Sequence, residues 1–89
     1  MLRQRVIFSG HVQGVGFRAT ARSIARKHPV TGWVRNCEDG TVEMEVQGSK
    51  EGVEACLGDL RRRMAGFIKG EQASVASVEP DERDFEIRR

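Results

Sequence analysis

Hydrophobic residues recur with two different spacings along the first third of the chain. Residues 3–9 alternate, with Val6 and Phe8 on one face, which predicts a strand. Residues 17–27 instead carry apolar side chains at i, i+4, i+7 and i+8, which predicts a helix. The apolar stripe of this helix consists of Phe17, Ala21, Ile24 and Ala25. Pro29 ends the helix, because the residue before a proline is driven out of the α region.

Two further strands are predicted at residues 31–37 and 41–47, joined by a hairpin turn that Gly40 closes. In the second of these strands apolar and polar residues alternate, which places one face against a core. Ser49 is a suitable N-cap for a second helix, whose side chains repeat with helical spacing. The apolar stripe of the second helix consists of Val53, Leu57, Leu60 and Met64.

The last part of the chain predicts a loop at residues 66–70 and strands at 74–79 and 84–88. The order is then β-α-β-β-α-β with a short terminal strand. This order predicts an α+β fold, the ferredoxin-like sandwich, in which two helices cover one face of an antiparallel sheet. No repeat or linker divides the chain, so we expect a single domain over residues 1–89.

The predicted topology brings two separate segments together. The first two strands form a βαβ crossover and run in the same direction, so their C-terminal ends lie at one sheet edge. The third strand lies between them, which separates the two ends by about 10 Å. If Val34 packs under the helices, Asn36 shares its face and points toward the start of the first helix. A small anion would fit between the two strand ends.

A glycine-rich loop precedes that helix, with three glycines in residues 10–16. Glycines allow consecutive backbone N–H groups to face one hollow, and the helix N-terminus adds partial positive charge. Arg18 in the first turn supplies a permanently charged fork that suits phosphate oxygens. The loop matches neither the Walker A pattern nor GxGxxG, so by itself it indicates an anion site only weakly.

Composition and charge narrow the functional classes. With 38% hydrophobic and 31% charged residues, the chain is neither collagenous nor plainly disordered. No apolar run approaches the ~20 residues of a membrane helix, so no membrane association and a cytoplasmic location are expected. Residues 1–36 carry seven basic and no acidic residues, whereas residues 37–89 carry eight basic and thirteen acidic ones. This asymmetry favours an anionic partner, either a nucleic acid or a smaller anion.

Two segments together resemble the acylphosphatase family. They are GxVQGVGFR over residues 10–18 and GWVRNxxDGxVE over residues 32–43, and the similarity extends over the whole chain. The resemblance implies a hydrolase that splits the carboxyl–phosphate bond of small acyl phosphates into a carboxylate and inorganic phosphate. It implies no metal and no cofactor, and it implies that the product phosphate inhibits. We expect such an enzyme to be a monomer.

The resemblance also assigns roles to residues of this sequence. Arg18 corresponds to the phosphate-binding arginine of the family and Asn36 to its water-orienting asparagine. The backbone amides that correspond to the phosphate cradle belong to Gln13, Gly14, Val15, Gly16 and Phe17. The group that accepts the proton of the attacking water is not identified, and the substrate phosphate is one candidate. His11 and Cys37 depart from the common pattern, which bears on substrate preference rather than on reaction class.

Two other functions fit parts of the pattern. RNA-recognition domains share the βαββαβ order, but they stack bases on exposed aromatics of the central strands. Here the outer face of the third strand offers Thr41, Glu43 and Glu45, so we expect no nucleic-acid binding. A non-catalytic domain, like the one that begins hydrogenase-maturation carbamoyl transferases, is a second alternative. Because the chain ends at Arg89, a free-standing enzyme is favoured.

The remaining conspicuous residues have simpler interpretations. His28 is expected to cap a helix end, and Trp33 to cover the open face of the sheet. The arginines at positions 61–63 are expected to be a solvated helix face. Cys37 and Cys56 lack zinc-ligand spacing and are expected to be free thiols.

Overall fold

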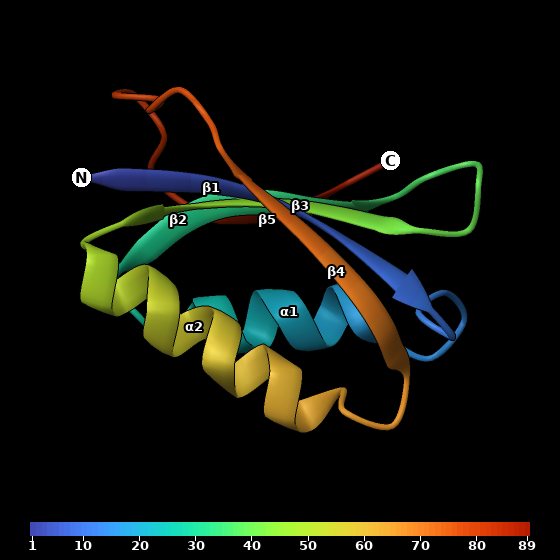
Figure 1. Cartoon of the computed structure of the whole chain (residues 1–89). Helices are drawn as coiled ribbons and strands as arrows, with labels where there is room; N and C mark the ends of the chain where they lie inside the picture. Colours follow the sequence, from blue (N-terminus) through green and yellow to red (C-terminus); the bar gives the residue numbers. More distant parts are fainter.

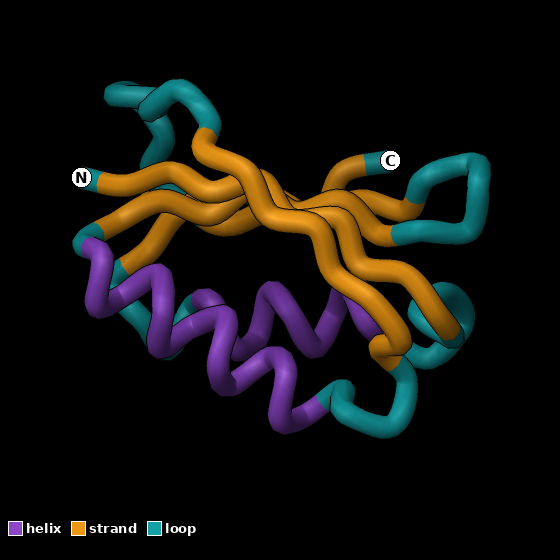
Figure 2. Tube along the Cα trace, viewed as in Figure 1, coloured by secondary structure: helices purple, strands orange, loops and turns teal.

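The computed structural model describes all residues, 1–89, as two layers. Both helices lie side by side on one face of a five-stranded sheet, and the other face is crossed by a loop (Figures 1 and 2). The elements are β1 (Leu2–Gly10), α1 (Phe17–Ala25), β2 (Val30–Asn36), β3 (Val42–Gly48), α2 (Lys50–Arg63), β4 (Ile68–Val75) and β5 (Phe85–Arg88). The ferredoxin-like α+β arrangement predicted from the sequence is confirmed.

The strand order is β4-β1-β3-β2-β5, so β3 lies between β1 and β2 as predicted. Both neighbours pair with β3 in antiparallel register, which makes β1 and β2 parallel to each other. The sheet is nevertheless mixed, because β5 pairs with β2 in parallel. The expectation of a wholly antiparallel sheet was therefore wrong at this edge. Residues 76–84 cross from the β4 edge to the β5 edge, and this crossing sets the direction of the last strand.

The fourth strand is the other point of difference from the sequence prediction. It runs over Ile68–Val75, so the predicted loop at 66–70 and the predicted strand at 74–79 were both misplaced. Nearly all its side chains are exposed, so hydrophobic alternation does not mark its limits. Antiparallel pairing with β1 defines this strand instead, from Gln4 opposite Val75 to Gly10 opposite Ile68. The predicted helix at 17–27 is also shorter, since its last residues form hydrogen-bonded turns after Ala25.

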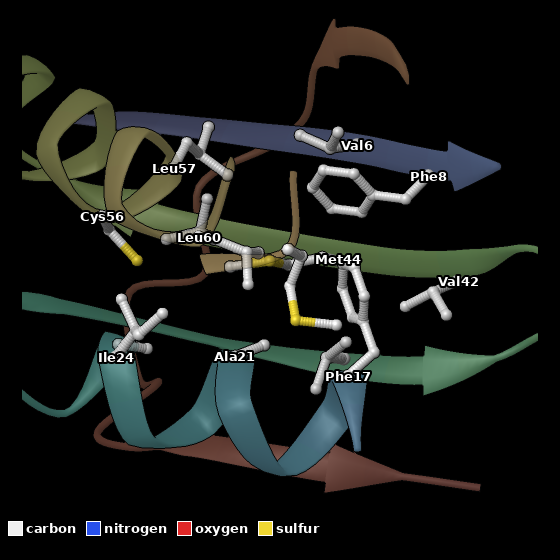
Figure 3. Packing of buried hydrophobic residues seen from close by; sticks show 14 of the residues in the cluster. Val6, Phe8, Phe17, Ala21, Ile24, Val42, Met44, Cys56, Leu57 and Leu60 are labelled. Carbon is white, nitrogen blue, oxygen red and sulfur yellow. The ribbon is translucent and has the colours of Figure 1, made fainter. Parts of the chain in front are cut away.

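One hydrophobic core fills the space between the sheet and the two helices (Figure 3). Phe8 of β1 and Phe17 at the start of α1 pack with ring centroids 5.1 Å apart, which joins the strand to the helix across the glycine loop. The predicted inward faces of β1, β3 and both helices are all buried here. Cys56 and Cys37 are free, as predicted, and burial raises the pKa of the Cys56 thiol to about 11.

The helix surface resolves two of the simpler predictions. His28 was expected to cap a helix end, but its ring contacts α2 instead: Nε2 lies 2.6 Å from Asp59 Oδ2, which links the segment after α1 to α2. The arginines of α2 are exposed, as predicted, and Arg61 pairs with Glu71 of β4 at 2.8 Å. Arg62 pairs with Asp59. These ion pairs connect surface elements, and they partly neutralise the basic residues 61–63.

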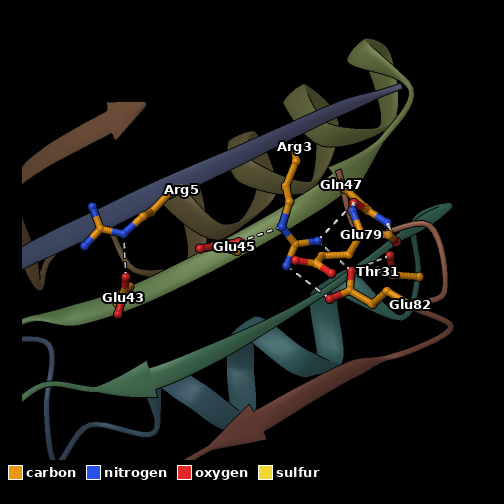
Figure 4. A network of polar contacts seen from close by, with 8 residues as sticks. All are labelled: Arg3, Arg5, Thr31, Glu43, Glu45, Gln47, Glu79 and Glu82. Atoms are coloured by element: carbon orange, nitrogen blue, oxygen red, sulfur yellow. Dashed lines mark hydrogen bonds and ion pairs between the residues drawn. The ribbon is translucent and has the colours of Figure 1, made fainter. Parts of the chain in front are cut away.

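A network of charged side chains covers the outer face of the sheet (Figure 4). Arg3 is only 1% exposed, and its guanidinium donates to Glu45 at 2.6 Å and to Glu82 at 2.9 Å. Gln47 accepts from the same guanidinium at 3.0 Å and donates to the Glu79 carbonyl at 2.8 Å. Because Glu79 and Glu82 belong to the crossing loop, the network holds residues 76–84 against the sheet. Buried charge is tolerated here because each group has a partner.

The ion pairs of Glu43, in the same layer, predict that the free energy of unfolding depends on pH. Burial alone would raise the pKa of Glu43, but hydrogen bonds from Arg5 and Arg35 outweigh it and lower that pKa below its usual range. The stabilisation is therefore complete above the ordinary glutamate pKa and is lost as the pH falls through the lowered value. We expect Glu43→Gln to cost about 1 kcal/mol at pH 7, because both arginines are partly solvated. Urea unfolding from pH 7 down to about 2 should show the difference from wild type vanishing.

The matched control for Glu43 is Glu38→Gln, which removes an exposed carboxylate that has no ion pair. Its free energy of unfolding should follow wild type at every pH. A difference for Glu43→Gln that persisted in strong acid would show that its cost is steric rather than ionic.

Candidate active site

The loop between β1 and α1 depends on glycine at two positions. Gly14 and Gly16 both have φ of +76°, a conformation that other residues rarely adopt. A Cβ at either position would meet nothing within 4 Å, so backbone conformation and not space requires glycine there. Gly16 is also the residue that precedes α1, and no side chain caps that helix. The loop thus delivers an uncapped helix N-terminus to the surface.

Consecutive backbone N–H groups in this segment are left without protein acceptors. None of the amides from Val12 to Ala19 donates a hydrogen bond within the chain; the flanking donors are those of His11, to Phe67 O, and Thr20, to Gly16 O. Three of these amides belong to the first helical turn, where orphan donors are normal. The others belong to the glycine loop, where folded proteins usually find partners for buried donors. The segment can therefore donate several hydrogen bonds to an external anion.

The side chain of Gln13 anchors this loop to the β2–β3 turn. Its Nε2 donates to the Cys37 carbonyl at 2.8 Å and to the Thr41 carbonyl at 2.9 Å. These bonds cross between segments that are far apart in the sequence, and they hold the loop beside the end of β2. Figure 1 shows the loop, the start of α1 and the β2–β3 turn at the same end of the molecule.

An open cleft of about 720 Å³ lies at this end of the sheet. Arg18 of α1 and Asn36 at the end of β2 both line it, so the topology brings the two residues together as the crossover argument expected. Of the five loop residues predicted from the sequence, the lining includes Gly14, Gly16 and Phe17. Gln13 and Val15 do not line it: Gln13 faces the β2–β3 turn, and Val15 packs against the core. The full lining is Val12, Gly14, Gly16, Phe17, Arg18, Ala19, Arg22, Asn36, Ile87 and Arg89.

The charged side chains that line this cleft are all positive. Arg18, Arg22 and Arg89 line it, no acidic residue does, and none of the three arginines forms an ion pair within the chain. By contrast, Arg3 and Arg5 of the basic N-terminal part are neutralised by glutamates on the outer face of the sheet. Of the basic residues in the N-terminal part, Arg18 and Arg22 are thus the ones that line the cleft. Such a site attracts a multiply charged anion.

Sequence reasoning missed two of these arginines. Arg22 follows Arg18 by one helical turn, so the i, i+4 spacing was a usable signal. Arg89 had no signal in the sequence, because its position depends on the parallel pairing of β5 with β2. His11, also singled out from the sequence, lies outside the lining, and its ring is 6.5 Å from that of Phe67.

The structure has neither a metal-binding cluster nor a membrane-spanning helix. No three His, Cys, Asp or Glu side chains gather in a way that could hold a metal ion. No helix has the length and apolar character needed to cross a membrane. On the outer sheet face, Trp33 is 8% exposed and is covered by the Arg88 guanidinium at 4.8 Å. Trp33 thus covers the sheet, as predicted, and offers no stacking platform for bases.

The fold and the cleft define a class: a ferredoxin-like α+β protein with an arginine-lined cleft at the C-terminal ends of the parallel strands β1 and β2. Comparison with known proteins specifies the family. The family model for acylphosphatase matches residues 4–87. An acylphosphatase of Geobacillus thermodenitrificans (strain NG80-2) is 42% identical over 88 residues, which cover 98% of this chain and 94% of the relative. An acylphosphatase of Rhizobium etli is 45% identical over 84 residues, which cover 93% of this chain and 89% of the relative.

Solved structures agree with this assignment. The crystal structure of acylphosphatase from Bacillus subtilis matches with a TM-score of 0.88 at 26% identity and covers 100% of both chains. The T. kodakarensis HypF structure matches with a TM-score of 0.86 at 28% identity, over 100% of this chain but 12% of that chain. The chain belongs to the acylphosphatase family. It is a hydrolase of acyl phosphates, as the resemblance in its sequence implied.

Proposed function

We propose that this cleft performs the hydrolysis without a metal, and that Arg18 and the loop amides bind the phosphate while Asn36 orients the attacking water. One observation carries the proposal: the unpartnered amides of residues 12–19 lie in the same segment as an unpaired Arg18, whose cleft also contains Asn36. In this assignment the cradle includes the backbone amides of Gln13, Gly14, Val15, Gly16 and Phe17, although the side chains of Gln13 and Val15 pack elsewhere. The amides of Arg18 and Ala19 extend it.

Hydrolysis at such a site needs one displacement at phosphorus. The water oxygen forms a bond to phosphorus as the bond from phosphorus to the acyl oxygen breaks, and the carboxylate leaves with the bonding electrons. The proton of the water passes to a phosphate oxygen, so the products are a carboxylate and inorganic phosphate. Negative charge stays on the phosphoryl oxygens throughout, where Arg18 and the amides stabilise it.

The chemistry of the residues in the cleft suits these roles, in which Arg18 and the amides bind the phosphate and Asn36 orients the water. Asn36 cannot take up a proton at neutral pH, but its amide oxygen accepts a hydrogen bond from water and its NH₂ donates one. A carboxylate is a good leaving group, so positioning and charge stabilisation are the main requirements. The cleft contains no carboxylate that could act as a base. Transfer of the proton to the substrate itself accounts for that composition.

The proposal predicts metal-independent turnover. With acetyl phosphate as substrate, we expect exhaustive EDTA treatment to leave kcat and KM unchanged, because every proposed contact comes from the chain. Inorganic phosphate should inhibit competitively, since it occupies the same cradle. A loss of activity with EDTA that is restored by added Mg²⁺ or Zn²⁺ would contradict the proposal.

We also propose that the enzyme acts as a cytoplasmic monomer on a small, diffusible acyl phosphate and binds neither nucleic acid nor membranes. The absence of an exposed aromatic on the outer sheet face supports the exclusion of RNA. The same assay with acetyl phosphate tests the alternative that the chain is a non-catalytic domain of the kind found within larger proteins. A non-catalytic domain would bind phosphate and leave acetyl phosphate intact.

A further inference from the structure

We propose that Arg22 and Arg89 form a second anion subsite beside the phosphate position, which makes the enzyme prefer acyl phosphates whose acyl group carries its own negative charge. This inference rests on the proposed function of the cleft. It extends that function from acyl phosphates in general to those with an anionic acyl group.

The first support is the number of free cations. One phosphate is already matched by Arg18 and by the amides of the loop, yet Arg22 and Arg89 also line the cleft. Neither has an ion pair or a side-chain hydrogen bond within the chain. Like charges gathered in one hollow repel each other unless an anion compensates them. With three arginines, the cleft carries more positive charge than one phosphate dianion neutralises.

The second support is the position of Arg22. Arg18 and Arg22 are one helical turn apart on α1, about 6 Å along the helix axis. An anion that pairs with Arg22 while the phosphate pairs with Arg18 would lie further along the helix by about the same distance. The displacement corresponds to the length of a small acyl group.

The third support is the rest of the wall. The cleft volume of about 720 Å³ lies within the range of sites for whole small molecules, about 300–1,000 Å³, and exceeds what one phosphate requires. Ile87 of β5 lines the same cleft as Arg22 and Arg89. An apolar side chain beside the two arginines suits a carbon chain that ends in a carboxylate or a second phosphate.

A nearby carboxylate does not occupy this subsite. Asp84 lies close enough to Arg22 to be influenced by its charge, but it does not line the cleft. Its oxygens already accept hydrogen bonds from the Phe85 backbone N–H at 2.8 Å and from Arg26 at 3.3 Å. Arg22 therefore remains available to a ligand.

The test compares two rigid substrates of similar size, para-carboxybenzoyl phosphate and para-carbamoylbenzoyl phosphate. The first carries a second negative charge and the second does not, and the aromatic ring prevents cyclisation. We expect wild type to show the higher kcat/KM with the charged substrate at fixed ionic strength. Arg22→Gln should reduce the ratio of charged to neutral kcat/KM about five- to tenfold, mainly through KM. Arg22→Lys should restore much of it, because the charge returns.

Arg63→Gln is the matched control, because it also removes one exposed helix arginine that has no ion pair but lies outside the cleft. Its ratio should equal that of wild type. An equal fall in both variants would mean that only long-range charge matters, and it would overturn the subsite. An unchanged ratio in Arg22→Gln, or no preference in wild type, would overturn it as well.

A binding measurement separates this inference from the proposed chemistry. Para-carboxyphenylphosphonate and para-carbamoylphenylphosphonate cannot be hydrolysed, so calorimetric titration with both needs no turnover. Tighter binding of the carboxylate that is lost in Arg22→Gln supports the subsite even if the assays of hydrolysis fail. Equal affinities of the two phosphonates for wild type would reject the subsite while leaving the acylphosphatase mechanism intact.

Discussion

Replacement of Arg18 by alanine is expected to lower kcat/KM for acetyl phosphate by about 10³-fold. The guanidinium is the one charged group in the first turn of α1, directly after the glycine loop, and no carboxylate in the chain competes for it. In the proposed mechanism, its loss removes a contact to the phosphoryl oxygens both in the bound substrate and in the transition state. Binding of inorganic phosphate should therefore weaken as well, by about tenfold or more.

Folding provides the internal check on Arg18→Ala. The side chain makes no hydrogen bond or ion pair within the chain, so the free energy of unfolding should change by less than about 0.5 kcal/mol. Arg63→Ala removes the same charge from an exposed site on α2 and should retain wild-type kcat/KM. If Arg18→Ala keeps wild-type affinity for phosphate, the cradle does not use this residue and its assignment is wrong.

Replacement of Asn36 by alanine is expected to lower kcat by about 10²-fold or more while phosphate still binds. Asn36 stands at the end of β2 and lines the same cleft as the loop that we propose to bind the phosphate, so we assign its contribution to the water. Stopped assays with acetyl phosphate and calorimetry with inorganic phosphate measure the two effects separately. The separation of turnover from binding distinguishes this residue from Arg18, whose loss impairs both.

Asn36→Asp makes the assignment more specific. The aspartate has the same shape but adds a negative charge beside the phosphate, so both kcat and phosphate affinity should fall. Wild-type turnover in Asn36→Ala would show that another group orients the water. A parallel loss of phosphate affinity in the alanine variant would move Asn36 from the water to the phosphate.

The extent of agreement between sequence and structure follows from burial. The limits of β1, β3 and α1 were predicted to within two residues because each presents one apolar face to the core, so its periodicity is visible in the sequence. The element β4 was misplaced because its side chains are exposed on both faces. Its limits come from backbone pairing with β1, and backbone hydrogen bonds carry no side-chain signature.

The site divides in the same way. A general rule predicted from the sequence that Arg18 and Asn36 lie close together: the C-terminal ends of the two parallel strands in a βαβ crossover lie at one edge of the sheet. That rule concerns β1, α1 and β2 only, so it predicts nothing about the position of β5. The arrival of Arg89 and Ile87 in the cleft depends on the crossing loop and on the parallel pairing of β5 with β2.

By itself, the sequence determined the order of the elements, the inward faces of the helices and central strands, and the two segments that mark the acylphosphatase family. These are local properties, in which each residue's spacing to its neighbours decides the outcome. Only the tertiary structure decided which arginines remain unpaired. Arg3, Arg5 and Arg35 find glutamates on the outer face of the sheet, whereas Arg18, Arg22 and Arg89 find none. Pairing between distant segments depends on distances in space, and linear spacing does not contain them.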